Sequence, residues 1–244
     1  MKNIIGLLFL ILFFIKVGFC QWTENLEMYI SGGSSHPLES FLLNDFLSSN
    51  NIEPYSASNF EKYWNNGLDI SAGLGYGINN FLSVRAGFSY SHFSFNETPI
   101  NNFLEDAYLD IGPALGGTVE IVEFNSYKGA ANMYSFQLSA KLAYNFNFVT
   151  PYVLGGGGYL YVTRESIDIT NLAQDDIPAY DFSFAEQIPG EDSGGILGSA
   201  GLGIIFNITP AFKPFFEGNY FLGMTQDDDT IYYSIIGGLV FNFK

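Results

Sequence analysis

Two side chains in the first half of the chain have the types and the spacing for nucleophilic catalysis. His92 and Ser94 are separated by one residue, so in a β-strand both lie on the same face. A histidine can accept the hydroxyl proton of a serine and activate it, with an acid orienting the histidine. Glu97 is close in sequence but lies in the following loop, so the third member stays unassigned. The alternative is that His92 is an interfacial side chain with no catalytic role.

A second set of charged residues recurs at alternate positions inside apolar segments. The alternation places three acids and three bases on one face of the expected strands, namely Glu27, Asp69, Arg85, Lys141, Lys213 and Glu217. Inside a narrow closed sheet these charges must pair or be strongly penalised. The balance of signs predicts a salt-bridge network that plugs the interior. A gated pore or proton path is the alternative.

Most of the acidic residues lie outside the expected strands. The chain has 25 Asp and Glu against 9 Lys and Arg, a net charge of −16. No basic cluster is present, which argues against nucleic acid as a partner. Carboxylates could gather Ca²⁺, and the candidates are Asp227, Asp228 and Asp229, or Asp175 with Asp176. Solvated, mutually repelling charge is the simpler interpretation, so we predict neither a metal nor a cofactor.

Residues 1–20 read as a secretory signal peptide. Lys2 precedes an apolar run from Ile4 to Ile15, and small residues near Cys20 suit cleavage before Gln21. A lipidated Cys20 is the alternative, but Phe19 precedes it where a small residue is normal. Cleavage after Cys20 would leave residues 21–244 without cysteine, and so without disulfides or a thiol nucleophile.

The elements that position these residues are strands, as the segment from Gly67 to Phe95 illustrates. Large apolar residues occupy one parity, and small or polar residues occupy the other. Asn79 and Asn80 suit a tight two-residue turn between two such runs. The sequence contains no second layer large enough to cover the bulky face, so lipid is the expected cover.

Eight segments share this pattern, and most have the length of a tilted strand that crosses a bilayer. They are Trp22–Gly33, Gly67–Ile78, Phe81–Phe95, Tyr134–Asn147, Pro151–Arg164, Gly195–Ile208, Phe212–Met224 and Thr230–Phe243. Short turns, including 148–150 and 209–211, alternate with long loops over 33–66, 96–133 and 165–194. The prediction is an all-β, eight-stranded antiparallel transmembrane β-barrel with short periplasmic turns and long extracellular loops. The first loop contains Pro37–Leu47, whose apolar spacing indicates a short amphipathic helix.

Aromatic residues on the outward parity are expected to form two girdles at the membrane interfaces. Those near the short turns are Tyr76, Tyr144, Phe146, Tyr152, Phe206, Phe241 and Phe243, and those near the loops are Tyr90, Tyr134, Phe136, Tyr220 and Tyr233.

The segment PYVLGGGGYLYV at Pro151–Val162 and the closing GLVFNF at Gly238–Phe243 carry a family resemblance. Together with the eight alternating segments, they resemble the outer-membrane β-barrel domain of OmpA-like, OmpX-like and opacity-type proteins. The resemblance implies the Gram-negative cell envelope, with outer-membrane lipid and lipopolysaccharide as surroundings. It also implies a barrel-assembly machinery that reads the last strand, here through Gly238, Phe241 and Phe243. Ile236 departs from the usual polar residue, and Lys244 follows the terminal aromatic.

Three functions are compatible with this sequence. The leading interpretation is a non-catalytic surface barrel whose extracellular loops are structural, adhesive or partner-binding. The second is a narrow, porin-like channel for small or hydrophobic solutes. The third is a lipid A-modifying enzyme, because a lipid-facing His92 and Ser94 are similar to the pair in lipid A deacylase barrels.

Overall fold

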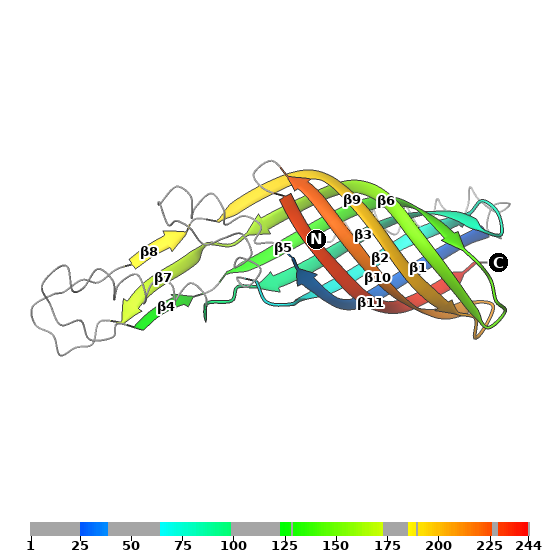
Figure 1. Ribbon diagram of the computed structural model, residues 1–244, viewed down its shortest axis with the longest axis horizontal. Helices are drawn as coiled ribbons and strands as arrows, with labels where there is room; N and C mark the ends of the chain where they lie inside the picture. The colour runs from blue at the N-terminus through cyan, green and yellow to red at the C-terminus, as the bar shows by residue number, and fades with distance from the viewer. Residues whose placement is uncertain are drawn as a thin grey trace, which may run out of the picture.

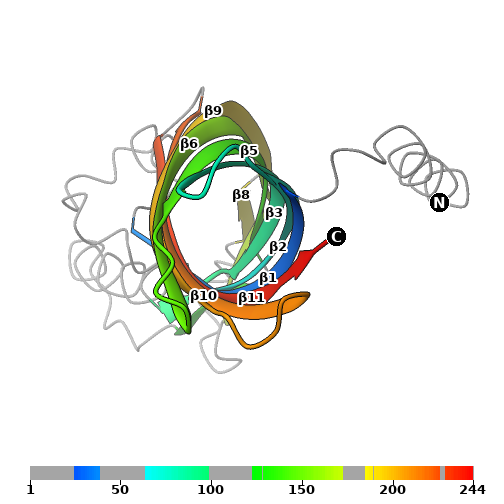
Figure 2. The ribbon, with the colours of Figure 1, turned by 90° about the vertical axis from the view of Figure 1, so that its right-hand side faces the viewer.

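The computed structural model describes residues 25–38, 64–98, 123–127, 129–172, 185–188, 190–225 and 229–243. Eight strands close into one antiparallel barrel, in the spatial order β1-β11-β10-β9-β6-β5-β3-β2 (Figure 2). They are β1 (Leu26–Pro37), β2 (Gly67–Gly77), β3 (Leu82–Ser94), β5 (Ala130–Ala143), β6 (Val149–Arg164), β9 (Glu191–Phe206), β10 (Phe212–Thr225) and β11 (Asp229–Asn242). Pairing of β1 with β11 completes the wall, so the barrel has no free edge strand. The predicted fold class is confirmed.

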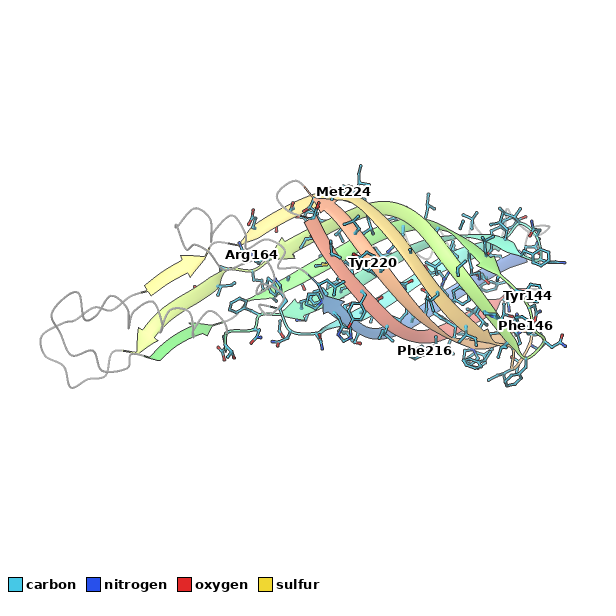
Figure 3. The ribbon with its side chains drawn as sticks, in the orientation of Figure 1. Tyr144, Phe146, Arg164, Phe216, Tyr220 and Met224 are labelled. Carbon is cyan, nitrogen blue, oxygen red and sulfur yellow. The ribbon has the colours of Figure 1, made fainter. Side chains whose placement is uncertain are left out.

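The pleat of each strand separates an apolar exterior from a more polar interior. On β5, Phe136 and Leu138 are 56% and 55% exposed, whereas Ser135 and Lys141, which have the opposite parity, are buried. Figure 3 shows Phe216 and Tyr220 on the outside of the wall, and Tyr144 and Phe146 at one end of the barrel. A monomer in water rarely exposes so continuous an apolar surface. The exterior therefore contacts hydrocarbon, and the strands are the membrane-crossing elements.

No described residue belongs to a helix that is both long and apolar enough to cross a membrane.

The short connections lie at the end of the barrel that holds the C-terminus (Figure 1). Asn79 lies in the turn between β2 and β3, where its Oδ1 accepts hydrogen bonds from the backbone N–H groups of Phe81 and Leu82, each at 2.9 Å. The predicted turn over 148–150 is displaced, because β5 ends at Ala143 and Asn147 adopts a positive φ of 61°. Asparagine tolerates this conformation better than most residues, which places the reversal before Val149.

The first strand lies later in the chain than predicted. It starts at Leu26 and continues through Gly33 to Pro37, since Ser35 points inward to bond Asp69 at 3.0 Å. On the outside, His36 stacks on Tyr233 with the ring centroids 4.6 Å apart. Pro37 therefore closes a strand and does not open the expected helix. The rest of Pro37–Leu47 after Leu38 lies outside the described residues.

A second sheet extends beyond the barrel at the end opposite the C-terminus (Figure 1). It consists of β4 (Glu123–Tyr127), β7 (Ile167–Leu172) and β8 (Ala185–Ile188), in the order β4-β7-β8. These residues were predicted to be loop. In the chain, β4 precedes β5, β7 follows β6, and β8 precedes β9, so three adjacent wall strands are each prolonged. At the junction, Arg164 Nη2 of β6 contacts Glu191 Oε2 of β9 at 3.3 Å (Figure 3).

Candidate functional site

The barrel lumen holds a buried ion pair that joins β3 to β10 across the interior. Arg85 on β3 places its Nη1 2.7 Å from Oε2 of Glu217 on β10, and both side chains are 6% exposed. Tyr152 donates its hydroxyl to the same Oε2 at 2.6 Å, and Asn219 Nδ2 donates to Oε1 at 2.9 Å. The ring of Tyr29 lies 3.9 Å from the guanidinium carbon of Arg85, a favourable cation–π geometry. The Glu217 carboxylate is thus satisfied on both oxygens.

A second pair lies beside the first. Lys141 Nζ on β5 donates to Oε1 of Glu27 on β1. The same ammonium is 5.8 Å from the ring centroid of Tyr152, which places Tyr152 between the two pairs. Four of the six predicted lumen charges are therefore brought together as two ion pairs in one connected layer.

The other two predicted charges are not brought into that layer. Asp69 is 2% exposed and accepts hydrogen bonds from Ser35 and Ser91, at 3.0 and 2.8 Å. Lys213 is half-buried near the start of β10, and it forms no ion pair with any described residue. Asp69 thus has hydroxyl donors but no basic partner in the part of the chain that the structure describes.

Apolar side chains fill the lumen on both sides of the charged layer. Toward the short turns, a buried cluster contains Tyr152, Ile205, Phe215, Ile236 and Val240. Toward the loops, six large side chains are at most 1% exposed: Phe93, Met133, Leu160, Val162, Leu197 and Tyr232. A pocket of about 40 Å³ lies next to Asp69, Arg85 and Glu217. At these levels the described inward side chains pack against one another, as expected for eight strands.

Sequence reasoning missed two tyrosines of this site. Tyr152 was assigned to the outer girdle, but it points inward and is 5% exposed, which corrects that assignment. Tyr29 was not assigned at all. Each lies directly across a strand pair from a glycine, Tyr29 from Gly73 and Tyr152 from Gly203. A Cβ on Gly203 would lie 2.4 Å from the Tyr152 ring, so the glycine makes room for it. Inward tyrosine opposite inward glycine is a sequence signal that could have found both.

Other aromatics assigned to the girdles lie on the exterior. Those with the largest exposure are Tyr144 at 55%, Phe146 at 58%, Phe136 at 56% and Tyr220 at 45%. Along the loop-side belt, Tyr90 and Tyr134 have ring centroids 5.2 Å apart, and Tyr134 and Tyr161 have theirs 6.5 Å apart. This ladder crosses β3, β5 and β6.

The candidate catalytic pair is on the outside of β3, and each member has a different partner. His92 Nδ1 donates to Asn132 Oδ1 at 2.9 Å, and Tyr90 donates its hydroxyl to the same oxygen. Ser94 Oγ accepts a hydrogen bond from Asn65 Nδ2 at 3.3 Å. No hydrogen bond joins His92 to Ser94 within the described ranges. Catalysis by this pair stays the untested alternative to a non-catalytic barrel.

The candidate assembly signal is at the C-terminal end of the wall. Gly238 and Phe241 belong to β11, and Phe243 follows its last residue. Of the candidate metal ligands, only Asp229 is described, as the first residue of β11; Asp175, Asp176, Asp227 and Asp228 lie outside the described residues. No three His, Cys, Asp or Glu side chains converge on a potential metal position in the described part.

No family model matches this chain. A curated relative, an uncharacterized protein of Coxiella burnetii, is 25% identical over 146 residues, covering 59% of this chain and 53% of the relative. The match thus spans about half the length of that protein.

Several solved structures are similar to the chain at low sequence identity. Neisserial surface protein A has 11% identity and a TM-score of 0.42, with 89% of this chain and 97% of that one covered. Ail of Yersinia pestis has 15% identity and a TM-score of 0.41, with 89% and 99% covered. The outer membrane protease OmpT from Escherichia coli has 10% identity and a TM-score of 0.43, with 91% and 97% covered. The closed wall, apolar exterior and packed lumen of this chain themselves define an eight-stranded membrane β-barrel of the outer-membrane type.

Proposed function

We propose that the protein is a non-catalytic surface barrel of a Gram-negative outer membrane that displays partner-binding extracellular loops. The observation that carries this proposal is the prolongation of three wall strands into the β4-β7-β8 sheet. A rigid barrel that continues into ordered strands beyond the apolar wall is suited to hold loops in fixed positions. The filled lumen leaves the loops as the region available for binding.

Export and assembly would bring the chain to the outer membrane. Residues 1–20 act as a cleaved signal peptide, and the assembly machinery reads Gly238, Phe241 and Phe243 on the last strand. Outer-membrane lipid and lipopolysaccharide then surround the apolar wall. The acidic loops face outward, where a ligand or partner protein binds them.

Separate deletion of each long loop tests this proposal. The segments between β1 and β2, between β3 and β5, and between β6 and β9 are each replaced by a short turn. Binding is scored against host matrix, other envelope proteins and lipopolysaccharide. We expect at least one deletion to abolish a binding activity of the full chain while circular dichroism shows that the barrel is retained. Binding unchanged in all three folded deletion variants would contradict the proposal.

The packed lumen predicts that the purified barrel does not conduct. In planar bilayers we expect no large stable openings, because apolar layers on both sides of the Arg85–Glu217 pair exclude a continuous water path. The Arg85→Ala variant, which empties part of the charged layer, is the comparison. Large stable openings of the wild-type barrel would favour the alternative of a narrow channel for small or hydrophobic solutes.

A non-catalytic barrel should leave lipid A unchanged. We expect cells that express wild-type protein, Ser94→Ala or His92→Ala to have identical lipid A acylation by mass spectrometry, because His92 bonds Asn132 and Ser94 bonds Asn65. Loss of an acyl chain that depends on both His92 and Ser94 would instead establish the deacylase alternative.

A further inference from the structure

The short turns at the C-terminal end of the barrel carry large apolar side chains and no charge. Residues 78–81, 144–148 and 207–211 contain no Asp, Glu, Lys or Arg. The apolar side chains of these turns are each 54–66% exposed, namely Ile78, Phe81, Phe146, Phe148 and Ile208. Turns in water are normally rich in polar residues, and a contiguous apolar surface that faces water is rare. These turns therefore require a cover other than water.

The three turns are joined to one another at this end of the barrel. The rings of Phe81 and Tyr144 have centroids 6.2 Å apart, and those of Tyr144 and Phe146 are 4.6 Å apart (Figure 3). The backbone N–H of Asn207 donates to the carbonyl oxygen of Phe148 at 2.8 Å, which joins the turn before β6 to the turn before β10. The resulting surface, the turn patch, comprises Ile78, Phe81, Tyr144, Phe146, Phe148 and Ile208.

The turn patch is continuous with the apolar wall of the barrel. Leu142 on β5 pairs with Val153 on β6, which pairs with Leu202 on β9, and all three face outward and are more than half exposed. No charged residue lies between these three positions and the turns that follow or precede them. Because the wall contacts hydrocarbon, the same bilayer is the cover that lies next to the turn patch.

The backbone of the turns is hydrogen-bonded within the protein, as entry into lipid requires. In the turn before β6, the backbone N–H groups that have acceptors are those of Tyr144, Phe146, Asn147 and Phe148. The side chains involved are uncharged, since Asn145 Oδ1 accepts from the N–H of Asn147 and Asn207 Nδ2 donates to the carbonyl oxygen of Asn147, each at 2.8 Å. In the turn before β10, Thr209 Oγ1 accepts from the N–H of Phe212 at 3.1 Å. Paired backbone groups allow these turns to leave bulk water.

We propose that the turn patch binds phospholipid of the turn-side leaflet, so that the three short turns lie in the interfacial layer of the bilayer and not in the periplasm. Aromatic side chains are favoured at this level, between the hydrocarbon and the headgroups. The turns carry no basic residue that would select anionic headgroups, so the partner is the neutral glycerol and upper acyl region that all phospholipids share. The inference does not depend on what the extracellular loops bind.

Spin labels in the turns of the full chain test the depth of the turn patch. Cys20 is the only cysteine, so a Cys20→Ser background allows a single label at Phe148→Cys or at Ile208→Cys. In phosphatidylcholine vesicles, the accessibility of each label to oxygen, which concentrates in lipid, is divided by its accessibility to a polar nickel complex on both sides of the membrane. We expect this ratio to be severalfold higher at both turn positions than at Asn66→Cys, an exposed position at the loop end. Leu138→Cys in the middle of the wall marks the upper limit.

Two results would assign the turn patch to another occupant and overturn the proposal. A ratio at both turn positions equal to that at Asn66→Cys would leave the patch to water or to a soluble periplasmic partner. Line broadening that grows with the protein-to-lipid ratio would mean that a second copy of the chain covers it.

A double variant provides a second measurement that needs no label. Phe148→Ser with Ile208→Ser should lower the urea midpoint of unfolding in vesicles, because two apolar side chains lose their contact with lipid in the folded state only. In water these exposed side chains would contribute little, and the same substitutions would leave the midpoint unchanged. Asn66→Ser at the loop end is the control and should keep the midpoint of the wild type. A wild-type midpoint in the double variant would also contradict the proposal.

Discussion

The Glu217→Leu variant should unfold at much lower urea than the wild type, with a loss of about 3–5 kcal/mol in the free energy of unfolding. The loss arises because Arg85 stays buried at 5% exposure while its carboxylate partner at 2.7 Å is removed. Tyr152 and Asn219 each lose a hydrogen-bond acceptor as well. Equilibrium unfolding in lipid vesicles, followed by tryptophan fluorescence and by gel mobility of unheated samples, measures the change.

Two further variants separate the unpaired charge from a general packing defect. Lys213→Leu removes a half-buried lumen-parity base that has no ion-pair partner among the described residues, so it should cost far less. Replacing both partners, as Arg85→Met with Glu217→Leu, should recover much of the lost stability, because neither charge is then buried alone. If the double variant is as unstable as Glu217→Leu, the unpaired guanidinium is not the cause.

The period-two alternation was sufficient to predict the barrel, since lipid imposes the same requirement on every strand. In a closed wall each outward residue contacts hydrocarbon and each inward residue contacts the lumen, so parity is read directly from hydrophobicity. The inward parity of Arg85, Glu217, Lys141 and Glu27 followed from this rule. Parity could not predict which acid pairs with which base, because the partners are separated by as many as 132 residues in sequence.

Strand ends were harder to predict than strand interiors. Ser34, Ser35 and His36 look like loop residues, yet Ser35 is fixed by Asp69, and His36 stacks on Tyr233. The β4-β7-β8 sheet was missed for a related reason. Beyond the bilayer neither face of a strand must be apolar, so the alternation that identifies the wall strands is weaker there. Proximity to a turn predicts a girdle position for Tyr152, but the exposed position on this part of β6 is the neighbouring Val153, at 54%, so the parity of the strand directs Tyr152 inward.

Because the exterior contacts hydrocarbon, the stability cost of a charged substitution on it should depend strongly on its depth in the membrane. Leu138 is 55% exposed in the middle of β5, between Tyr134 toward the loops and Leu142 toward the turns. The Leu138→Arg variant should lose about 2–4 kcal/mol of stability in vesicles, because the guanidinium must enter the bilayer near its midplane. Reversible folding into vesicles of defined thickness, titrated with urea, provides the measurement.

Leu142→Arg is the matched control for this experiment. Leu142 has nearly the same exposure, 53%, and lies on the same strand and the same face, but one residue before the end of β5. An arginine there can reach the interface, so we expect a cost of about 0–1 kcal/mol. The difference between the two variants reports depth alone, since size, charge and strand are held constant. Equal costs at the two positions, or a Leu138→Arg barrel as stable as the wild type, would mean that β5 does not cross the hydrocarbon.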